Sequence, residues 1–164
     1  MPRQNLIEGP LTGSVIGASH EVYNSLGFGF LEHIYKAALE RELLELGHKV
    51  AREVSVAVMY KEQPLASQRL DMLVEDRLVV EVKSTFDLHP GVERQVRNYL
   101  RATYLRVGLV LHFGLEPKFD RVVELHTKQA PTKRVITDST DETDLTDRSS
   151  AAIPPCASSD HDGL

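Results

Sequence analysis

Two stretches near the start of the chain place apolar residues at helical spacing. Within residues 12–25 the apolar positions recur at spacings that bring them to one side of a helix, and Thr12 or Ser14 is available as the N-cap. A glycine-containing link follows. The helical spacing then returns over residues 29–47, where Gly47 is placed as a C-terminal stop. The pattern predicts two helices that form an α-hairpin at the front of the domain.

The pattern then changes to an alternation of apolar and polar positions. Residues 50–60 alternate and predict a strand, which ends in a turn around Pro64 because proline cannot donate a hydrogen bond to a sheet. Residues 68–75 and 77–83 predict two further short strands. The Glu75-Asp76 dipeptide separates these two strands, so a tight antiparallel hairpin is expected.

The remaining elements complete an α/β pattern. Residues 78–82 are apolar except for Glu81, which is typical of a central strand covered on both faces. A helix is predicted over residues 92–104, a buried strand over 107–113 and a last strand over 121–125. The order ααβββαβ(β) predicts a mixed central sheet flanked by helices. The helical crossover should make the strand before it and the strand after it parallel.

The hydrophobic periodicity stops near residue 130. Residues 131–164 carry seven acidic and three basic side chains, so −4 of the net charge of −5 lies in this segment. The segment contains a fourfold Thr-Asp-x repeat over residues 137–148 and ends in a stretch rich in Ala, Ser and Pro. Such a composition buries too little apolar surface to offset the entropy cost of ordering. We therefore expect one folded domain at residues 1–130 and a disordered acidic tail at residues 131–164.

Composition excludes several classes of protein. Hydrophobic residues make up 41% of the chain and charged residues 26%, as in a soluble globular domain. No apolar run reaches the roughly 18 residues of a membrane span, and the first residues do not resemble a signal peptide, so a cytoplasmic protein without membrane contact is expected. The single cysteine, Cys156, can form neither an internal disulfide nor a Cys-based zinc site. Residues 1–130 are nearly neutral, which neither requires nor excludes a nucleic-acid partner.

Acidic residues in the apolar hairpin are the candidates for chemistry. A tight turn places Asp71 across from residue 80 or 81, and Glu81 and Lys83 project from one face because side chains alternate along a strand. Two carboxylates side by side repel each other, and a divalent cation such as Mg²⁺ is the usual compensation. An ordinary ion pair of Glu81 with Lys83 or Arg77 on a solvated face accounts for this short pattern equally well.

Several motifs together resemble a known family. Asp71, followed by Glu81-Val82-Lys83 and by Gln95 and Tyr99 at i and i+4, resembles the core motif of the PD-(D/E)XK nuclease superfamily, with the Gln-x-x-x-Tyr helix of its RecB-like branch. The segment Gly29-Phe30-Leu31-Glu32-His33-Ile34-Tyr35 resembles the motif that names the GxxExxY family of small bacterial proteins. The similarity spans residues 11–123. It implies a restriction-endonuclease-like fold and metal-dependent hydrolysis of phosphodiesters.

The resemblance implies a site that binds Mg²⁺ or Mn²⁺ beside a catalytic lysine. The residues that match are Asp71, Glu81, Glu32 and the backbone carbonyl of Val82 as metal ligands, and Lys83 as the lysine. Glu32 would lie on the second helix as an additional acid facing the metal. The alternative for Glu32 is an exposed carboxylate paired with Lys36 at i+4.

The third helix carries two further sets of candidates. In the RecB-like pattern Gln95 and Tyr99 help to position the active-site lysine and the nucleic-acid backbone; alternatively, Tyr99 is a residue at the boundary of the core and Gln95 is merely exposed. Arg94, Arg97 and Arg101 lie at i, i+3 and i+7. This basic stripe would contact phosphates, or it is simply a solvated helix face.

Two positions depart from the family pattern. The first helix has Tyr23 where a histidine is typical, and His112 stands before Phe-Gly where an asparagine is frequent. Tyr23 removes the basis for expecting an imidazole near the metal.

The sequence thus favours two functions from different classes. The first is a metal-dependent nuclease that acts on DNA, or as second choice on RNA, by attack of water on a phosphodiester. The second is a non-catalytic module that keeps the nuclease fold and binds a nucleic acid or a protein. No target-recognition domain accompanies the domain on this chain, so a protein partner would supply substrate selection.

Overall fold

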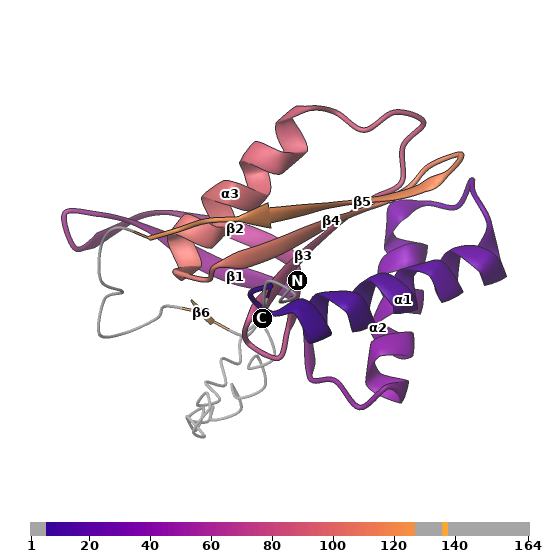
Figure 1. Cartoon of the computed structure of the whole chain (residues 1–164). Helices are drawn as coiled ribbons and strands as arrows, with labels where there is room; N and C mark the ends of the chain where they lie inside the picture. Colours follow the sequence, from indigo (N-terminus) through magenta and orange to yellow (C-terminus); the bar gives the residue numbers. More distant parts are fainter. Residues whose placement is uncertain (1–5, 127–135, 138–164) are drawn as a thin grey trace, which may run out of the picture.

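The computed structural model describes residues 6–126 and 136–137 (Figure 1). In chain order the elements are α1 (Gly9–Leu26), α2 (Glu32–Glu45), β1 (Val50–Tyr60), β2 (Gln63–Val74), β3 (Leu78–Lys83), α3 (Gly91–Thr103), β4 (Val107–Phe113), β5 (Pro117–Val123) and β6 (Ile136–Thr137). The strands form one sheet in the order β5-β4-β3-β2-β1-β6. The predicted α/β fold with a mixed central sheet is confirmed.

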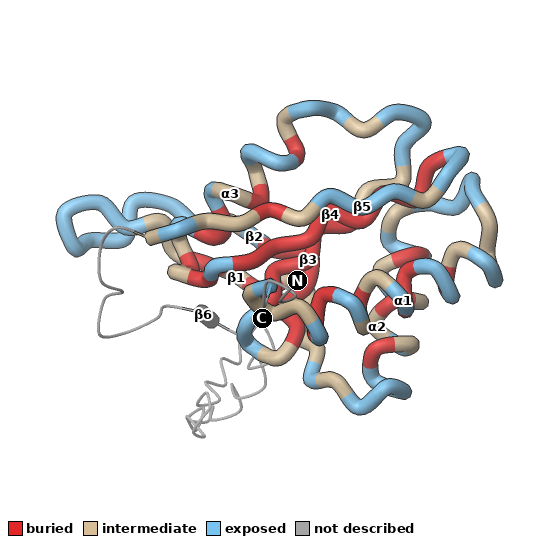
Figure 2. Tube along the Cα trace, in the orientation of Figure 1, coloured by how far each residue is buried: buried red, intermediate tan, exposed pale blue. Residues whose placement is uncertain are grey.

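Helices cover both faces of this sheet (Figure 1). On one face, α1 and α2 pack over a core that includes Tyr35, Leu39 and the alternate residues of β3 and β4. On the other face, α3 packs over a second core through Val96 and Leu100. All residues of β3 and β4 are buried except Lys83, as Figure 2 shows for the centre of the sheet. The crossover through α3 makes β3 and β4 parallel, as predicted.

The hairpin of β2 and β3 sets the register of the site. Glu75 and Asp76 both have φ 53°, and the amide of Arg77 donates to the carbonyl of Val74 over 3.1 Å, which makes the predicted two-residue turn. Met72 pairs with Val80 in this register. Asp71 is therefore brought beside Glu81, as expected.

Side-chain alternation reverses within β1 and β2 at one level of the sheet. Two pairs of residues three apart, which regular alternation would put on opposite faces, share the core under α3: Leu70 with Leu73, and Ala51 with Val54. Glu53 has φ 53° at this point. The register pairs Arg52 with Met72 and Val54 with Leu70, so Glu53 and Asp71 lie at the same level between them. The reversal brings both carboxylates to the same side as α2.

Helix starts differ from the sequence predictions. α1 begins at Gly9 with Glu8 in the N-cap position, so the prediction of Thr12 or Ser14 as the cap is wrong. Pro10 explains the earlier start, because proline favours the first helical turn; the Thr12 hydroxyl donates instead to the carbonyl of Gly9 over 2.9 Å. α2 begins at Glu32 rather than at residue 29, and Gly29 has φ 119° in the link before it.

Strand boundaries differ where the strands are exposed. β2 begins at Gln63 and includes Pro64, which the register shift between Val58 and Met59 accommodates. β5 covers Pro117–Val123 rather than residues 121–125, because it pairs with β4 along its whole length while burying few side chains. Such an edge strand has a weak hydrophobic pattern.

The predicted tail falls largely outside the described residues. Ile136 and Thr137 pair with Val56 and Ser55 of β1, and residues 127–135 and 138–164, with Cys156, are not among those described. Within the described part of the chain, no helix is both long and apolar enough to cross a bilayer.

Candidate active site

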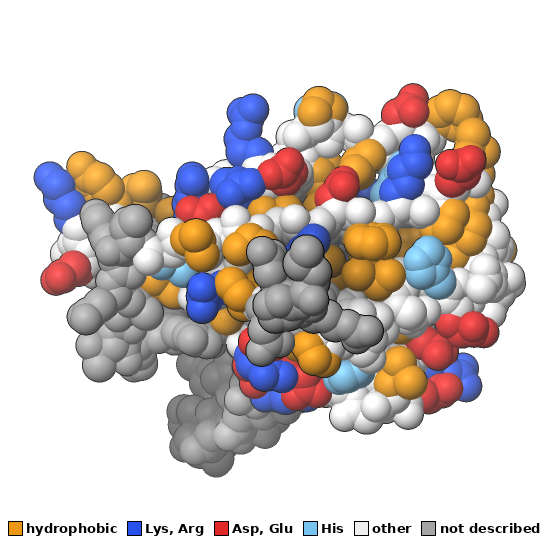
Figure 3. Space-filling model, viewed as in Figure 1, with side chains coloured by type: hydrophobic (Ala, Val, Ile, Leu, Met, Phe, Trp, Pro, Cys, Tyr) orange, Lys and Arg blue, Asp and Glu red, His pale blue; other side chains and the backbone are white. Residues whose placement is uncertain are grey.

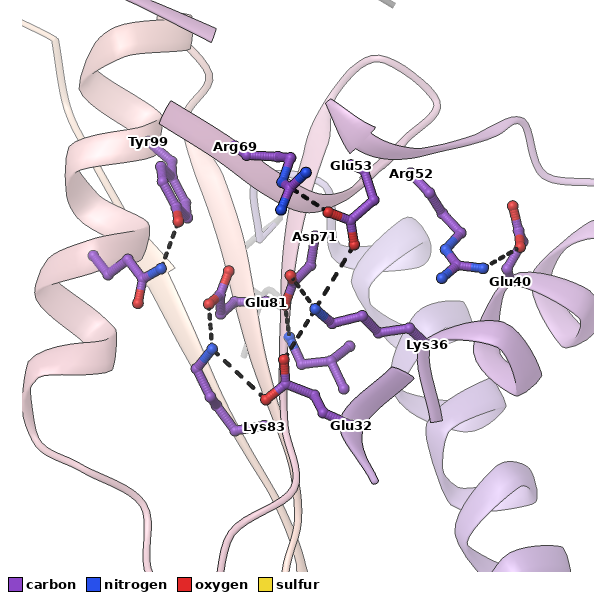
Figure 4. Close-up of polar contacts among 12 residues, drawn as sticks. Glu32, Lys36, Glu40, Arg52, Glu53, Arg69, Asp71, Glu81, Lys83 and Tyr99 are labelled. Atoms are coloured by element: carbon purple, nitrogen blue, oxygen red, sulfur yellow. Dashed lines mark hydrogen bonds and ion pairs between the residues drawn. The ribbon is translucent and has the colours of Figure 1, made fainter. Parts of the chain in front are cut away.

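Four carboxylates and two ammonium groups lie close together between α2 and the central strands (Figure 4). They come from four elements of the fold: Glu32 and Lys36 from α2, Glu53 from β1, Asp71 from β2, and Glu81 and Lys83 from β3. The hairpin and the reversal of alternation bring the strand residues together. The link before α2 brings Glu32.

Hydrogen bonds to the link between α1 and α2 position Glu32. The hydroxyl of Tyr35 donates to the carbonyl of Gly27 over 2.6 Å and accepts from the amide of Phe30 at 3.3 Å. The hydroxyl of Ser84, which follows β3, donates to the carbonyl of Phe30 over 2.7 Å. These bonds tie the start of α2 to the end of β3, so Glu32 faces the strand that carries the catalytic candidates.

Asp71 has a partner on each carboxylate oxygen. Its Oδ2 accepts the buried amide of Val82 over 2.9 Å, and its Oδ1 accepts the ammonium of Lys36 over 2.5 Å. Asp71 as a whole is 9% exposed. The regular pairing of β2 with β3 ends at Met72 and Val80. Beyond it, the Asp71 side chain accepts the Val82 amide in place of a backbone carbonyl.

Glu81 is the buried acid that the sequence marks as unusual. Its residue is 1% exposed; Oε1 accepts the ammonium of Lys83 over 2.6 Å, and Oε2 is buried with no hydrogen-bond partner. Burial raises the pKa of Glu81 to about 6; the Lys83 hydrogen bond opposes this rise and the charge of Asp71 adds to it. The Glu81–Lys83 ion pair expected as the alternative is present, but it is buried rather than solvated.

Lys83 interacts with acids from two elements. Besides Glu81, its ammonium lies 3.9 Å from Oε2 of Glu32. Burial alone would lower the pKa of Lys83, but the hydrogen bond to Glu81 and the charges of Glu81, Glu32 and Asp71 outweigh it and raise the pKa. Lys83 is therefore a charged donor near neutral pH.

Glu32 combines the two arrangements considered from the sequence. Lys36 at i+4 approaches Oε1 of Glu32 to 2.9 Å, which is the expected helix ion pair. The same carboxylate faces Lys83 with its other oxygen. Glu32 is therefore part of the acidic cluster through both lysines.

The helix on the opposite side contributes Tyr99, whose hydroxyl accepts from Nε2 of Gln95 over 2.5 Å (Figure 4). Tyr99 is 5% exposed and packs in the core between α3 and the sheet, and Gln95 is half-buried rather than exposed. Burial raises its pKa, opposed by the Gln95 hydrogen bond, and the charges of Glu81 and Asp71 raise it further. The aromatic ring is thus a core residue whose polar end lies near the acids.

Two of the three arginines of α3 contact Glu124, which follows β5. Arg97 contacts Glu93 at 2.6 Å and Glu124 at 3.3 Å, and Arg101 contacts Glu124 at 3.2 Å. Arg94 is exposed. Acidic neighbours therefore compensate part of the basic stripe.

The sequence of this chain matches the family model of the PD-(D/E)XK nuclease superfamily over residues 10–123. The protein belongs to this superfamily. Membership supports a nuclease type of function with a nucleic acid as the class of substrate. The finer assignments to the GxxExxY family and to the RecB-like branch stay predictions.

Other comparisons add little to the superfamily assignment. No curated protein matches the chain. Among solved structures, the crystal structure of SSO0001 has a TM-score of 0.47 and 14% sequence identity, over 71% of this chain and 59% of that one. A similarity at this level supports no conclusion about function.

The donors in the cluster suit the divalent metals that PD-(D/E)XK nucleases generally use. Carboxylate oxygens are the ligands that Mg²⁺ and Mn²⁺ prefer, and the unbonded, buried Oε2 of Glu81 is an oxygen that a cation would satisfy. In the part of the chain that the structure describes, no three Asp, Glu, His or Cys side chains are close enough together to hold one ion. The ammonium groups of Lys36 and Lys83 lie between the carboxylates instead.

Two members of the cluster escape sequence reasoning. The sequence predicts Lys36 only as an ion-pair partner of Glu32. In the structure its ammonium also bonds Asp71 and lies 3.9 Å from Glu53. Glu53 occupies the polar side of a regular alternation, and only its φ of 53° reveals that it turns toward α2. The i,i+4 spacing from the motif acid Glu32 is the one sequence feature that would have pointed to Lys36.

The positions that depart from the family pattern have structural partners. The hydroxyl of Tyr23 donates to the carbonyl of Leu115 over 2.6 Å, which ties α1 to the turn after β4. Nε2 of His112 lies 2.8 Å from the carbonyl of Thr85. Both residues hold loops in place.

Proposed function

We propose that this protein is a divalent-metal-dependent nuclease that hydrolyses phosphodiester bonds in DNA, or as second choice in RNA. The observation that supports it best is Glu81, a buried carboxylate with one unbonded oxygen, beside Asp71 and Lys83 in a domain of the nuclease superfamily. Burying such a group without full compensation is costly, and costs of this kind concentrate at functional sites.

Asp71, Glu81 and Glu32, with the backbone carbonyl of Val82, are the proposed ligands of Mg²⁺ or Mn²⁺. When bound, the ion would polarise the phosphate and lower the pKa of an attacking water. The hydrogen bond from the Val82 amide fixes one oxygen of Asp71, so its other oxygen has a defined direction.

Lys83 is proposed to act as a charged donor to the phosphate or to the attacking water. Its raised pKa favours this role over proton abstraction. Tyr99, oriented by Gln95, would help to place Lys83 and the nucleic-acid backbone from the α3 side.

Arg94, Arg97 and Arg101 are proposed to contact the phosphates of the substrate. In the face seen in Figure 3, Lys and Arg side chains are interspersed with Asp and Glu rather than gathered in one basic patch. Binding through a few arginines would be weak and salt-dependent, which agrees with a protein partner that supplies substrate selection. A cytoplasmic location stays a prediction of the sequence.

A second candidate function is a non-catalytic module that binds a nucleic acid or a protein. The observation that favours it is that two lysines already compensate the acids: Lys36 bonds Asp71 and Lys83 bonds Glu81. The two lysines thus neutralise much of the negative charge that would otherwise attract a metal ion.

Metal titration and cleavage measured together distinguish the two functions. Mn²⁺ would be titrated calorimetrically into the parent, Asp71→Ala, Lys83→Ala and the control Lys49→Ala, whose ammonium lies in an exposed pair with Asp76. The same proteins would be incubated with plasmid DNA, single-stranded DNA and RNA. A nuclease requires that Asp71→Ala loses metal binding, that both site variants lose cleavage and that the control keeps both. Metal binding by the parent without cleavage of any polymer would favour the module.

A further inference from the structure

Three carboxylates from three elements converge on one ammonium. Nζ of Lys36 lies 2.5 Å from Oδ1 of Asp71, 2.9 Å from Oε1 of Glu32 and 3.9 Å from Oε1 of Glu53 (Figure 4). The Lys36 side chain is 11% exposed. A surface ion pair has one partner and is open to water; this ammonium is largely enclosed by acids.

The contacts of Lys36 involve the oxygens that a metal ion would need. Oδ2 of Asp71 is held by the amide of Val82, so Oδ1 is the oxygen that remains for a cation, and Lys36 bonds it. The oxygen of Glu32 nearest to Lys36 is likewise taken. An ammonium and a divalent ion both seek the lone pairs of carboxylate oxygens, so they compete for the same positions.

Lys36 remains charged in this environment. Its Nζ lies 2.5 Å from Oδ1 of Asp71 and 2.9 Å from Oε1 of Glu32, and two acidic oxygens at these distances favour the ammonium form of an amine. The ammonium therefore reduces the repulsion between Asp71 and its acidic neighbours.

We propose that Lys36 is a built-in counter-cation of the site, and that a divalent ion binds only by displacing its ammonium from Asp71 and Glu32. Lys36 thereby lowers the affinity for metal while stabilising the fold before metal binds. This inference rests on the proposed function, because it concerns the same ligands.

Glu53 is the acceptor toward which Lys36 would move. Arg69 bonds Oε2 of Glu53 at 2.9 Å, while Oε1 faces Lys36 at 3.9 Å. The Glu53 side chain is 40% exposed, against 12% for Asp71, so movement toward Glu53 brings the ammonium closer to solvent. The reversal of alternation in β1 thus supplies a third acid within reach of the same lysine.

A charge-neutral variant tests the competition directly. Mn²⁺ would be titrated calorimetrically into the parent, Lys36→Gln and the control Lys49→Gln. The control removes the same charge from the exposed ion pair of Lys49 with Asp76, which lies in the turn between β2 and β3. Lys36→Gln should bind Mn²⁺ about tenfold more tightly or better. It should also melt at a lower temperature than the parent in a chelator, while Lys49→Gln resembles the parent in both measurements. A folded Lys36→Gln variant that binds Mn²⁺ no more tightly than the parent would overturn the inference.

A second measurement uses the parent protein, so it does not depend on the folding of the variant. Lysines would be modified with an amine-reactive reagent at fixed pH, with and without saturating Mg²⁺, and quantified residue by residue by mass spectrometry. The rate at Lys36 should rise several-fold with Mg²⁺, whereas the rate at Lys49 should not change. An unchanged rate at Lys36 in metal-saturated protein would contradict displacement.

The outcomes separate this inference from the proposed function. If the parent binds metal, Asp71→Ala does not, and Lys36→Gln binds as the parent does, the metal site stands and the competition is refuted. If neither the parent nor Lys36→Gln binds metal, both proposals fail. If Lys36→Gln binds metal and the parent does so weakly or not at all, the competition is supported.

Discussion

The two acid–lysine pairs of the site differ in how completely their charges are compensated. Asp71 receives a backbone amide on one oxygen and Lys36 on the other, whereas Glu81 receives Lys83 on one oxygen and nothing on the other. Both acids are buried, with residue exposures of 9% and 1%. The backbone of β3 therefore completes the hydrogen bonding of Asp71, while Glu81 keeps one buried oxygen that a cation or a proton would satisfy.

The largest effect on stability is expected at the fully bonded pair. Asp71→Ala leaves the Lys36 ammonium and the Val82 amide without their nearest acceptor, and should lower the free energy of unfolding by about 3 kcal/mol. Urea denaturation in a chelator measures this. Asp76→Ala, which breaks the exposed pair with Lys49, is the control and should change it by less than about 0.5 kcal/mol. Equal losses in the two variants would show that Asp71 is not held as described.

The free energy of unfolding should depend on pH through Glu81, the acid of the other pair, by about 2 kcal/mol. The pKa of Glu81 is about 6 in the folded protein, above the ordinary value of 4.5, so the folded state binds the proton more tightly than the unfolded state. Its contribution to stability is present below pH 4.5 and is lost as the pH rises through 6. Glu81→Gln lacks this titration, so without metal the parent should lose about 2 kcal/mol relative to Glu81→Gln between pH 4 and pH 7.

Denaturation of the parent and Glu81→Gln at several pH values checks that sign. If the free energy of unfolding changed with pH in the same way in both proteins, the pKa of Glu81 would not be raised in the folded state, and Glu81 would not differ from Asp71 as described.

A smaller effect should follow from Tyr99→Phe, which removes the hydroxyl that accepts from Gln95 near Glu81. The free energy of unfolding should fall by about 1 kcal/mol. Cleavage should slow roughly tenfold at unchanged Mn²⁺ affinity, because the hydroxyl positions groups and is not a ligand. Calorimetry and single-turnover cleavage together check this. Loss of metal affinity in Tyr99→Phe would show that the α3 side belongs to the metal site itself.

The smallest effect on stability is expected at Arg101, which contacts neither pair. Arg101→Ala breaks an exposed contact with Glu124 and should change stability by less than about 0.5 kcal/mol. If Arg101 contacts a phosphate, the dependence of log K on log salt should flatten by about one unit. DNA binding measured at several salt concentrations, in the presence of Ca²⁺ in place of Mg²⁺, tests this. An unchanged slope would assign Arg101 to the ion pair alone.

Sequence reasoning predicts the part of the site that local rules determine. The two-residue turn at Glu75-Asp76 fixes the register of the hairpin, and that register places Asp71 beside Glu81. The continuous apolar run of β3 predicts that Glu81 is buried, because a central strand is covered on both faces. The superfamily resemblance is confirmed over nearly the same residues that carry the motifs.

The rest of the site depends on backbone geometry that composition does not encode. Glu53 faces α2 only because alternation reverses at a non-glycine residue with positive φ. Lys36 bridges Asp71 and Glu32 only because the link held by Tyr35 sets the start of α2 against β3. Both are long-range consequences, so neither the periodicity nor the motif spacing predicts them.

We propose that these acids form a site for a divalent ion once Lys36 moves away. The most direct measurement is an anomalous-difference map of crystals grown with Mn²⁺. We predict one strong peak in contact with oxygens of Asp71 and Glu81, with the Lys36 ammonium no longer bonded to Asp71. A map at full Mn²⁺ saturation with no peak near these oxygens, and with Lys36 still bonded to Asp71, would show that the acids do not form a metal site.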